Sequence, residues 1–200
     1  MTDKQRRVAA VVLAAGMSTR MKADKLLVQI DGQPLVCRVV RSVEASHARP
    51  IIVVTGHEHE HVTAALAGVD CRIVHNTNFR SGLSTSLRAG VAAASECDGA
   101  MILLGDMPAV SSFLIDKMTA AFDPDKGRAI CVATYKGRRG NPVLFDRRFF
   151  PELLAITGDV GARDIVGKYP ELVCEVESGN EGPLIDLDTR EQLEQFLRRS

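Results

Sequence analysis

Short runs of apolar, mostly β-branched residues alternate with longer amphipathic stretches along most of this chain. Runs of this length that are apolar throughout are typical of strands buried in a parallel sheet. Their alternation with amphipathic stretches predicts an α/β fold, a single-domain doubly wound architecture with a mostly parallel sheet. The expected strands lie at residues 8–13, 50–56, 71–74, 100–106 and 129–135.

Three of the intervening stretches have the pattern of amphipathic helices. Residues 34–45 begin with a proline, which suits a first helical position, and their apolar side chains recur on one face. Residues 83–96 and 111–122 are also expected to be helical, with Ser111 or Ser112 as the cap of the second. The later part of the chain is less regular. A basic glycine loop leads into a short strand at 135–145, a turn into a helix at 157–169, and a strand into a closing helix at 184–199.

Length and composition narrow the function class. A chain of 200 residues predicts one domain, here residues 1–200. Lysine plus arginine balance aspartate plus glutamate at 25 each, so the overall charge does not favour nucleic acid or an anionic membrane. The 5 cysteines are widely spaced and odd in number, which indicates reduced thiols and a cytoplasmic protein. No apolar run approaches the ~20 residues that a membrane helix needs.

The first strand can be interpreted in two ways. Arg6 and Arg7 before an apolar run, with small residues after it, are typical of a secretory signal peptide. A second basic cluster, Arg20, Lys22 and Lys25, follows directly, and a signal peptide has no use for it. The alternative is a strand that leads into a nucleotide-binding loop.

Ligands bind at the carboxyl ends of the strands in an open α/β sheet. After the first strand, Ala14, Ala15 and Gly16 would let backbone N–H groups approach a nucleotide, and Arg20 and Lys25 could hold its phosphates. The stretch matches neither common glycine-rich phosphate motif. A glycine turn followed by solvated charges is the alternative.

Carboxylates follow two other predicted strands. Asp106 comes after a buried run, where it could bind Mg²⁺, and Asp186 and Asp188 alternate along a predicted strand and would point to one side. An ordinary turn aspartate is the alternative at Asp106. Asp188 with Glu191 would also make a capping box for the last helix.

A fourth candidate is the sequence FRSGLSTSL, where Gly82 and three hydroxyl side chains open a predicted helix. Such a helix start can bind a base edge or an anion. Simple N-capping by the same hydroxyls is the alternative.

Seven motifs occur in the order found in one enzyme family: VLAAGMSTRMKADKLL, TGH, GLSTSL, LLGDMPAV, GNPVLF, TGDVGAR and IDLDT. In this order the chain resembles the molybdenum cofactor cytidylyltransferases of the MobA-like nucleotidyltransferase superfamily. The resemblance implies a Rossmann-like nucleotidyltransferase fold and Mg²⁺-dependent transfer of CMP from CTP to molybdopterin. The products would be molybdopterin cytosine dinucleotide and pyrophosphate. It also favours a retained nucleotide loop over a signal peptide.

The resemblance also implies roles for individual residues. Residues up to about 110 would bind the nucleotide and residues from about 111 the acceptor. Arg20, Lys25 and Asp106 would be catalytic, and Asp106, Asp188 and Asp186 would bind the metal. The nucleotide would be bound by Leu13, Ala14, Ala15, Gly16, Arg20, Lys25, Thr55, Gly82, Ser84 and Asp106, with Gly82 and Ser84 at the base. The acceptor would be bound by Asn141, Asp159 and Arg163, with Arg138 and Arg139 adding charge for its phosphate.

Three alternatives stay open at this point. Asp24 and Lys25 resemble the guanylyltransferase branch, whereas Ala14 and Ala15 resemble the cytidylyltransferase branch. A sugar-phosphate nucleotidyltransferase would use the same fold. A non-catalytic protein that binds finished cofactor and delivers it to a molybdoenzyme would use the same pocket. Both an enzyme and a delivery protein are expected to make transient contact with a recipient molybdoenzyme or its chaperone. Binding to nucleic acid or to a membrane is not expected.

Overall fold

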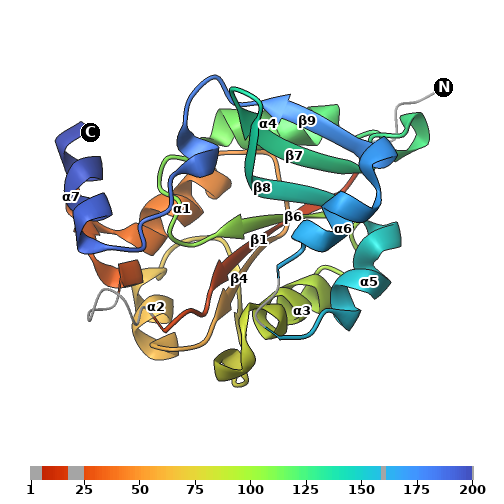
Figure 1. Ribbon diagram of the computed structural model, residues 1–200. Coiled ribbons are helices and arrows are strands. Elements are labelled where there is room, and N and C mark those ends of the chain that lie inside the picture. The colour runs from red at the N-terminus through yellow and green to blue at the C-terminus, as the bar shows by residue number, and fades with distance from the viewer. Residues whose placement is uncertain (1–5, 18–24, 159–160, 200) are drawn as a thin grey trace.

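A seven-stranded sheet runs through the centre of the molecule in the order β5-β4-β1-β6-β8-β7-β9 (Figure 1). The structure is a computed structural model that describes residues 6–17, 25–158 and 161–199. The strands of this sheet are β1 (Val8–Ala14), β4 (Ile51–Thr55), β5 (Arg72–His75), β6 (Gly99–Leu104), β7 (Ile130–Tyr135), β8 (Arg138–Asp146) and β9 (Val173–Glu177). A separate pair, β2 (Gln29–Ile30) and β3 (Gln33–Pro34), lies outside it.

The first half of the sheet is parallel, as the sequence predicts. β1 pairs with β4 on one side and β6 on the other, and β4 pairs with β5. The prediction of a buried strand at 71–74 was too simple, because β5 lies at the edge of the sheet and is partly exposed. The overall prediction of a mostly parallel α/β sheet is confirmed.

The second half contains one reversed strand. β8 runs antiparallel to both β6 and β7, while β7 and β9 are parallel. The reversal follows from a tight hairpin, in which Lys136 and Gly137 have φ of 50° and 74° between the paired residues Tyr135 and Arg138. Two consecutive positive φ values suit the right-handed twist of a hairpin. The basic loop and short strand expected at 135–145 are thus a tight hairpin turn and a longer strand, because β8 already begins at Arg138.

Helices cover both faces of the sheet (Figure 1). One face carries α1 (Leu35–Glu44), α2 (His59–Ala65), α4 (Ser112–Ala121) and α7 (Arg190–Arg199). The other carries α3 (Leu83–Ala93), α5 (Phe150–Ala155) and α6 (Arg163–Lys168). The three predicted amphipathic helices are confirmed as α1, α3 and α4, and the helices expected within 157–169 and 184–199 are confirmed as α6 and α7. Ser111 caps α4, because its side chain accepts a hydrogen bond from the N–H of Leu114 at 3.3 Å.

The two faces share the side chains of the central strands. In β1, Ala10 and Val12 face one core, while Val11 and Leu13 face the other. This two-sided burial explains why the strand is apolar throughout. Gly90 brings α3 close to the sheet, since a Cβ there would overlap the side chain of Val11. All 5 cysteines are free, as their spacing predicts.

Residues 184–188 depart from the prediction, because they form no strand. Leu184 ends a short 3-10 helix at Gly182–Leu184, and residues 185–188, here called the acidic segment, run irregularly from it toward α7. The 3-10 helix packs closely on the sheet: a Cβ at Gly140 of β8 would overlap the carbonyl oxygen of Pro183. The carboxylates of the acidic segment are thus placed by packing and not by strand alternation.

Candidate nucleotide and metal site

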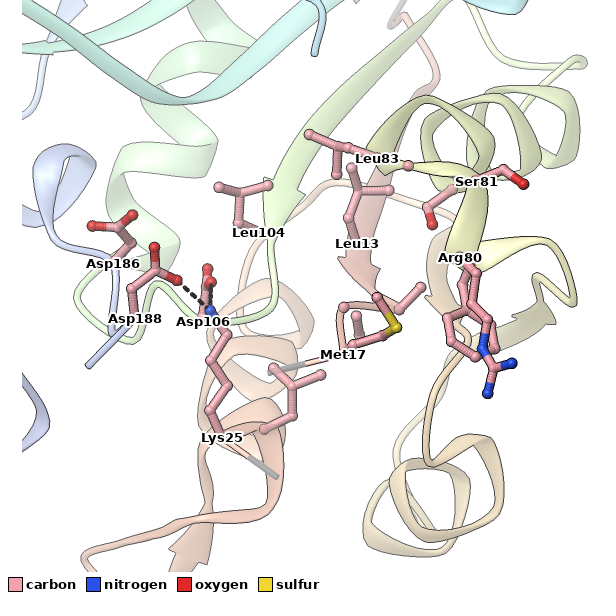
Figure 2. Close-up of a pocket in the computed structure, with 17 residues that line it drawn as sticks. Leu13, Met17, Lys25, Arg80, Ser81, Leu83, Leu104, Asp106, Asp186 and Asp188 are labelled. Atoms are coloured by element: carbon pink, nitrogen blue, oxygen red, sulfur yellow. Dashed lines mark hydrogen bonds and ion pairs between the residues drawn. The ribbon is translucent and has the colours of Figure 1, made fainter. Parts of the chain in front are cut away.

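A cavity of about 750 Å³ opens at the carboxyl ends of β1 and β6. Its walls come from five parts of the chain: the end of β1, the residues around Lys25, the start of α3, the end of β6 and the acidic segment (Figure 2). The lining residues that the sequence predicts are Leu13, Ala14, Ala15, Gly16, Lys25, Gly82, Asp106, Asp186 and Asp188. The structure therefore brings most of the predicted site together in one place.

The acidic side of the cavity centres on one ammonium group. The Nζ atom of Lys25 lies 2.6 Å from Oδ2 of Asp106 and 2.6 Å from Oδ1 of Asp188. The three side chains are only 13%, 16% and 31% exposed, respectively. Charge-assisted hydrogen bonds of this length are strong, and removing one member would leave a poorly solvated charge. Figure 2 shows Asp186 beside this group without a contact to Lys25.

Backbone hydrogen bonds fix the relative positions of these carboxylates. The N–H of Gly105 donates to the carbonyl oxygen of Leu13 at 2.9 Å, which holds the turn that carries Asp106 against β1. The N–H of Leu187 donates to the carbonyl oxygen of Asp106 at 3.1 Å. The N–H of Asp188 donates to Oε1 of Gln192 in α7 at 2.8 Å. The site therefore depends on contacts between distant parts of the chain.

The electrostatic surroundings keep Lys25 charged. Burial alone would lower the pKa of its ammonium, but the charge of Asp106 and hydrogen bonds to Asp106 and Asp188 outweigh that effect. The pKa of Lys25 is therefore raised above its ordinary value. At neutral pH the cavity contains a fixed positive charge between two carboxylates.

The donor set fits Mg²⁺. Oδ1 of Asp106 is buried and has no hydrogen-bond partner among the described residues, so one carboxylate oxygen is left for a further ligand. Mg²⁺ prefers oxygen and is usually bound by one or two carboxylates together with substrate phosphates. The described part of the chain contains no group of three His, Cys, Asp or Glu side chains placed to hold a metal ion. Asp106 and Asp188 would thus bind the metal together with phosphate oxygens.

Small residues form the wall next to this acidic group. Ala14 and Ala15 are 1% and 6% exposed, and both line the cavity. Gly56 packs directly behind Ala15, since a Cβ at Gly56 would lie 2.8 Å from the Cβ of Ala15. Because this packing is tight, the two alanines set the width of the cavity here.

The start of α3 is organised by a buried asparagine. Nδ2 of Asn76 donates to Oγ1 of Thr85 at 2.8 Å and to Oγ of Ser86 at 2.9 Å. Its Oδ1 accepts from the N–H of Asn78 at 3.0 Å, which fixes the orientation of the amide. Since Oγ of Ser86 accepts from Asn76, its own hydrogen remains to be donated elsewhere, and Ser86 lines the cavity.

Several lining residues were not singled out from the sequence. They are Met17, Leu26, Phe79, Arg80, Ser81, Leu83, Ser86 and Leu104. Arg80, Ser81 and Ser86 belong to the stretch FRSGLSTSL, whose basic and hydroxyl side chains could have indicated them. The apolar residues carry no such signal, because their pattern is that of an ordinary core.

Other predicted residues lie away from the cavity lining. Thr55 is fully buried, and its Oγ1 lies 2.7 Å from Nδ1 of His59. Ser84 is also buried, and its N–H donates to the carbonyl oxygen of Gly158 at 3.3 Å. Neither is among the residues that line the cavity. Arg20 and Asp159 lie outside the described residues.

The predicted acceptor residues lie at the margins. Asn141 is in β8, two positions before Val143, which pairs with Ile102 of β6. Arg163 is exposed at the first position of α6. Neither lines the cavity. Arg138 is exposed near the hairpin, and Nε of Arg139 lies 2.8 Å from Oε1 of Glu175.

Two relatives match nearly the full length of the chain. Nicotine blue oxidoreductase from Paenarthrobacter nicotinovorans is 29% identical over 95% of this chain and 96% of its own length. Purine catabolism protein PucB from Bacillus subtilis is 27% identical over 94% of this chain and 95% of its own. These names describe the relatives and do not define one substrate.

Solved structures agree with the fold. A nucleotidyl transferase from Methanothermobacter thermautotrophicus superposes with a TM-score of 0.84 at 25% identity, covering 97% of this chain and 99% of the other. Rv0371c from Mycobacterium tuberculosis, solved in complex with manganese, gives a TM-score of 0.80 at 25% identity and covers 97% and 100%. A protein of the same fold has thus been solved with a divalent metal.

None of the helices in the described ranges is long and apolar enough to cross a membrane.

The family follows from a match to a family model. Residues 10–173 match the model of the MobA-like NTP transferase domain, a span that contains most of β1 and the turn of Asp106. The chain therefore belongs to the MobA-like NTP transferase family and is a nucleotidyltransferase.

Proposed function

We propose that this nucleotidyltransferase transfers CMP from CTP to molybdopterin, with Mg²⁺, and releases pyrophosphate. The observation that carries this proposal is the pairing of Lys25 with Asp106 and Asp188 at the strand ends, beside a wall of small residues. Such a group can bind a metal–triphosphate complex. The order of the sequence motifs supports the choice of CTP and molybdopterin.

The reaction needs no protein nucleophile. A terminal phosphate oxygen of molybdopterin forms a bond to the α-phosphorus of CTP, and the bond between that phosphorus and the pyrophosphate oxygen breaks. Lys25 and Arg20 hold the triphosphate and counter the charge that develops on pyrophosphate. Mg²⁺, bound by Asp106 and Asp188, would supply further charge neutralisation. Asp186, farther from Lys25, stays a proposed ligand of the same metal.

The base is proposed to lie between the two alanines and the start of α3. Ala14 and Ala15 narrow the cavity on one side, and Gly82 is on the other. Ser86 adds a hydroxyl donor that Asn76 orients. A pyrimidine offers carbonyl acceptors for such a donor and needs less room than a purine.

Acceptor binding is proposed for Asn141, Asp159 and Arg163. Gly161, two positions before Arg163, lies next to the cavity wall: a Cβ there would lie 3.6 Å from Cδ2 of Leu83, which lines the cavity. Arg163 could bind a phosphate with two parallel hydrogen bonds. These contacts support placing the acceptor at the α3 side of the opening.

Pyrophosphate release tests the proposal. Wild-type protein is incubated with Mg²⁺, each of CTP, GTP and UTP, and either molybdopterin or a sugar phosphate. We expect release only with CTP and molybdopterin together. Preference for GTP would identify a guanylyltransferase, and release with a sugar phosphate a sugar-phosphate nucleotidyltransferase. Tight molybdopterin binding without release would indicate a delivery protein.

A further inference from the structure

The ammonium of Lys25 occupies the place where a metal would bind. It contacts one oxygen of Asp106 and one of Asp188, both at 2.6 Å (Figure 2). Two carboxylates that reach one point in this way can also bind a divalent cation. The lysine and the metal therefore compete for the same carboxylate oxygens. A metal ion and an ammonium held this close would also repel each other.

The same lysine can reach the phosphate-binding part of the cavity. Lys25 lines the cavity together with Ala15 and Gly16, so phosphates bound there would lie within the same space. A lysine side chain is flexible and can change partners without movement of the backbone. A triphosphate offers it several anionic oxygens in exchange for the two carboxylates.

We propose that Lys25 is an internal counter-ion that keeps free metal out until a nucleotide binds. Without nucleotide, the ammonium neutralises Asp106 and Asp188 and blocks metal binding. Nucleotide phosphates draw the ammonium away, and the carboxylates then accept the metal that arrives with the nucleotide. This inference rests on the proposed function only in taking Asp106 and Asp188 as metal ligands.

Binding of free Mn²⁺, measured by electron paramagnetic resonance without nucleotide or acceptor, tests the inference. Lys25→Met removes the charge but keeps an unbranched side chain, and Lys25→Arg keeps the charge. We expect Lys25→Met to bind Mn²⁺ at least ~10-fold more tightly than wild type, and Lys25→Arg to bind it as weakly as wild type. Equal or weaker Mn²⁺ binding by Lys25→Met would overturn the inference.

A matched double variant locates the gained metal. Adding Asp188→Asn to Lys25→Met removes one proposed ligand, so the gain in Mn²⁺ affinity should disappear. If the gain persists with the ligand removed, the metal binds elsewhere and the inference fails. With nucleotide present, Lys25→Met should bind the metal–nucleotide complex more weakly than wild type, because the phosphates lose a cation. Metal and nucleotide affinity would then move in opposite directions.

Thermal unfolding gives a second readout, because Lys25→Met leaves two carboxylates without their cation. Mn²⁺ should raise the melting temperature of this variant more than that of wild type, and a variant that folds only with Mn²⁺ also supports the inference. If Lys25→Met does not fold even with Mn²⁺, Lys25→Gln, whose amide can hydrogen-bond a carboxylate, takes its place in both measurements. If Mn²⁺ raises the melting temperature of the variant no more than that of wild type, the inference is contradicted.

The result is separable from the outcome of the transfer assay. If wild type transfers CMP to molybdopterin but Lys25→Met gains no Mn²⁺ affinity, the counter-ion role is wrong and the proposed function stands. If Lys25→Met gains affinity but wild type releases no pyrophosphate with CTP and molybdopterin, the counter-ion role stands and the substrates are wrong.

Discussion

The N–H of Leu187 donates a hydrogen bond to the carbonyl oxygen of Asp106 at 3.1 Å. This bond ties the acidic segment near the C-terminus to the turn after β6, and it places Asp188 next to Asp106 and Lys25. The second carboxylate of the site is thus supplied by a segment that follows a 3-10 helix packed tightly over β8.

We expect Gly140→Ala to disturb the site from a distance. A Cβ at Gly140 would overlap the carbonyl oxygen of Pro183, so the 3-10 helix that leads into the acidic segment must shift, at a cost on the order of 1–3 kcal/mol. Nucleotide-dependent Mn²⁺ binding should weaken as Asp188 moves away. Gly167→Ala is the matched control, because a Cβ there meets nothing within 4 Å. Urea unfolding and Mn²⁺ titration of both variants check this, and equal behaviour would contradict it.

The three carboxylates of the cavity should contribute unequally to the rate of nucleotidyl transfer. Asp188→Asn removes the charge that contacts Lys25 and should lower the transfer rate by ~100-fold or more, the effect of about 2.7 kcal/mol. Asp106→Asn should do the same. Asp186→Asn should cost much less, because no contact joins Asp186 to Lys25 among the described interactions. Steady-state transfer rates of the three variants are measured at saturating Mg²⁺. An equal loss of rate in all three would contradict the prediction.

Asn76→Asp should weaken nucleotide binding, although we do not expect residue 76 itself to contact the nucleotide. The new carboxylate oxygen cannot donate, so Ser86 would have to donate to it and could no longer donate into the cavity. We expect the KM for CTP to rise ~10-fold with little change in kcat. The free energy of unfolding should fall by about 1–3 kcal/mol, since buried hydrogen bonds are lost.

Ser86→Ala is the comparison for this prediction. If Asn76 acts by orienting Ser86, Ser86→Ala should raise the KM for CTP to a similar extent, and combining the two changes should add little. Fully additive effects on KM would show that Asn76 acts only through stability.

Base selectivity should change when the two alanines become glycines. Ala14→Gly with Ala15→Gly widens the cavity, so kcat/KM for GTP should rise relative to that for CTP. The two values are measured side by side, together with the melting temperature, because a glycine in a strand also lowers stability. An unchanged ratio would place base selection at the start of α3 instead.

Much of the fold could be predicted because its signals are local. The apolar runs of β1, β4 and β6 and the Ser111 cap of α4 depend on neighbouring residues only. The direction of β8 could not be predicted, since a buried antiparallel strand has the same apolar pattern as a parallel one. The strand expected at 184–188 is not formed: Leu187 is buried in the core, but its N–H donates to the carbonyl oxygen of Asp106 and the segment pairs with no strand among the described residues.

The sequence indicated which residues could belong to the candidate site, but it did not indicate which of them contact one another. Asp106 and Asp188 could be recognised as candidate metal ligands from their positions near predicted strands. Their contact with Lys25 joins residues 81 and 163 positions apart, and no local pattern encodes such a contact. Ser86 was not distinguished from the other hydroxyls of FRSGLSTSL, because its hydrogen bond from Asn76 joins it to a residue outside that stretch.

The central claim is that this chain transfers CMP to molybdopterin. Incubation of wild-type protein with Mg²⁺, molybdopterin and CTP labelled at the α-phosphate tests it most directly, with Asp106→Asn as the inactive control. We predict that the label moves from CTP to the pterin product, in amounts equal to the pyrophosphate released, with little transfer from labelled GTP and none by the variant. Label that stays on CTP, or moves only from GTP or only to a sugar phosphate, would contradict the claim.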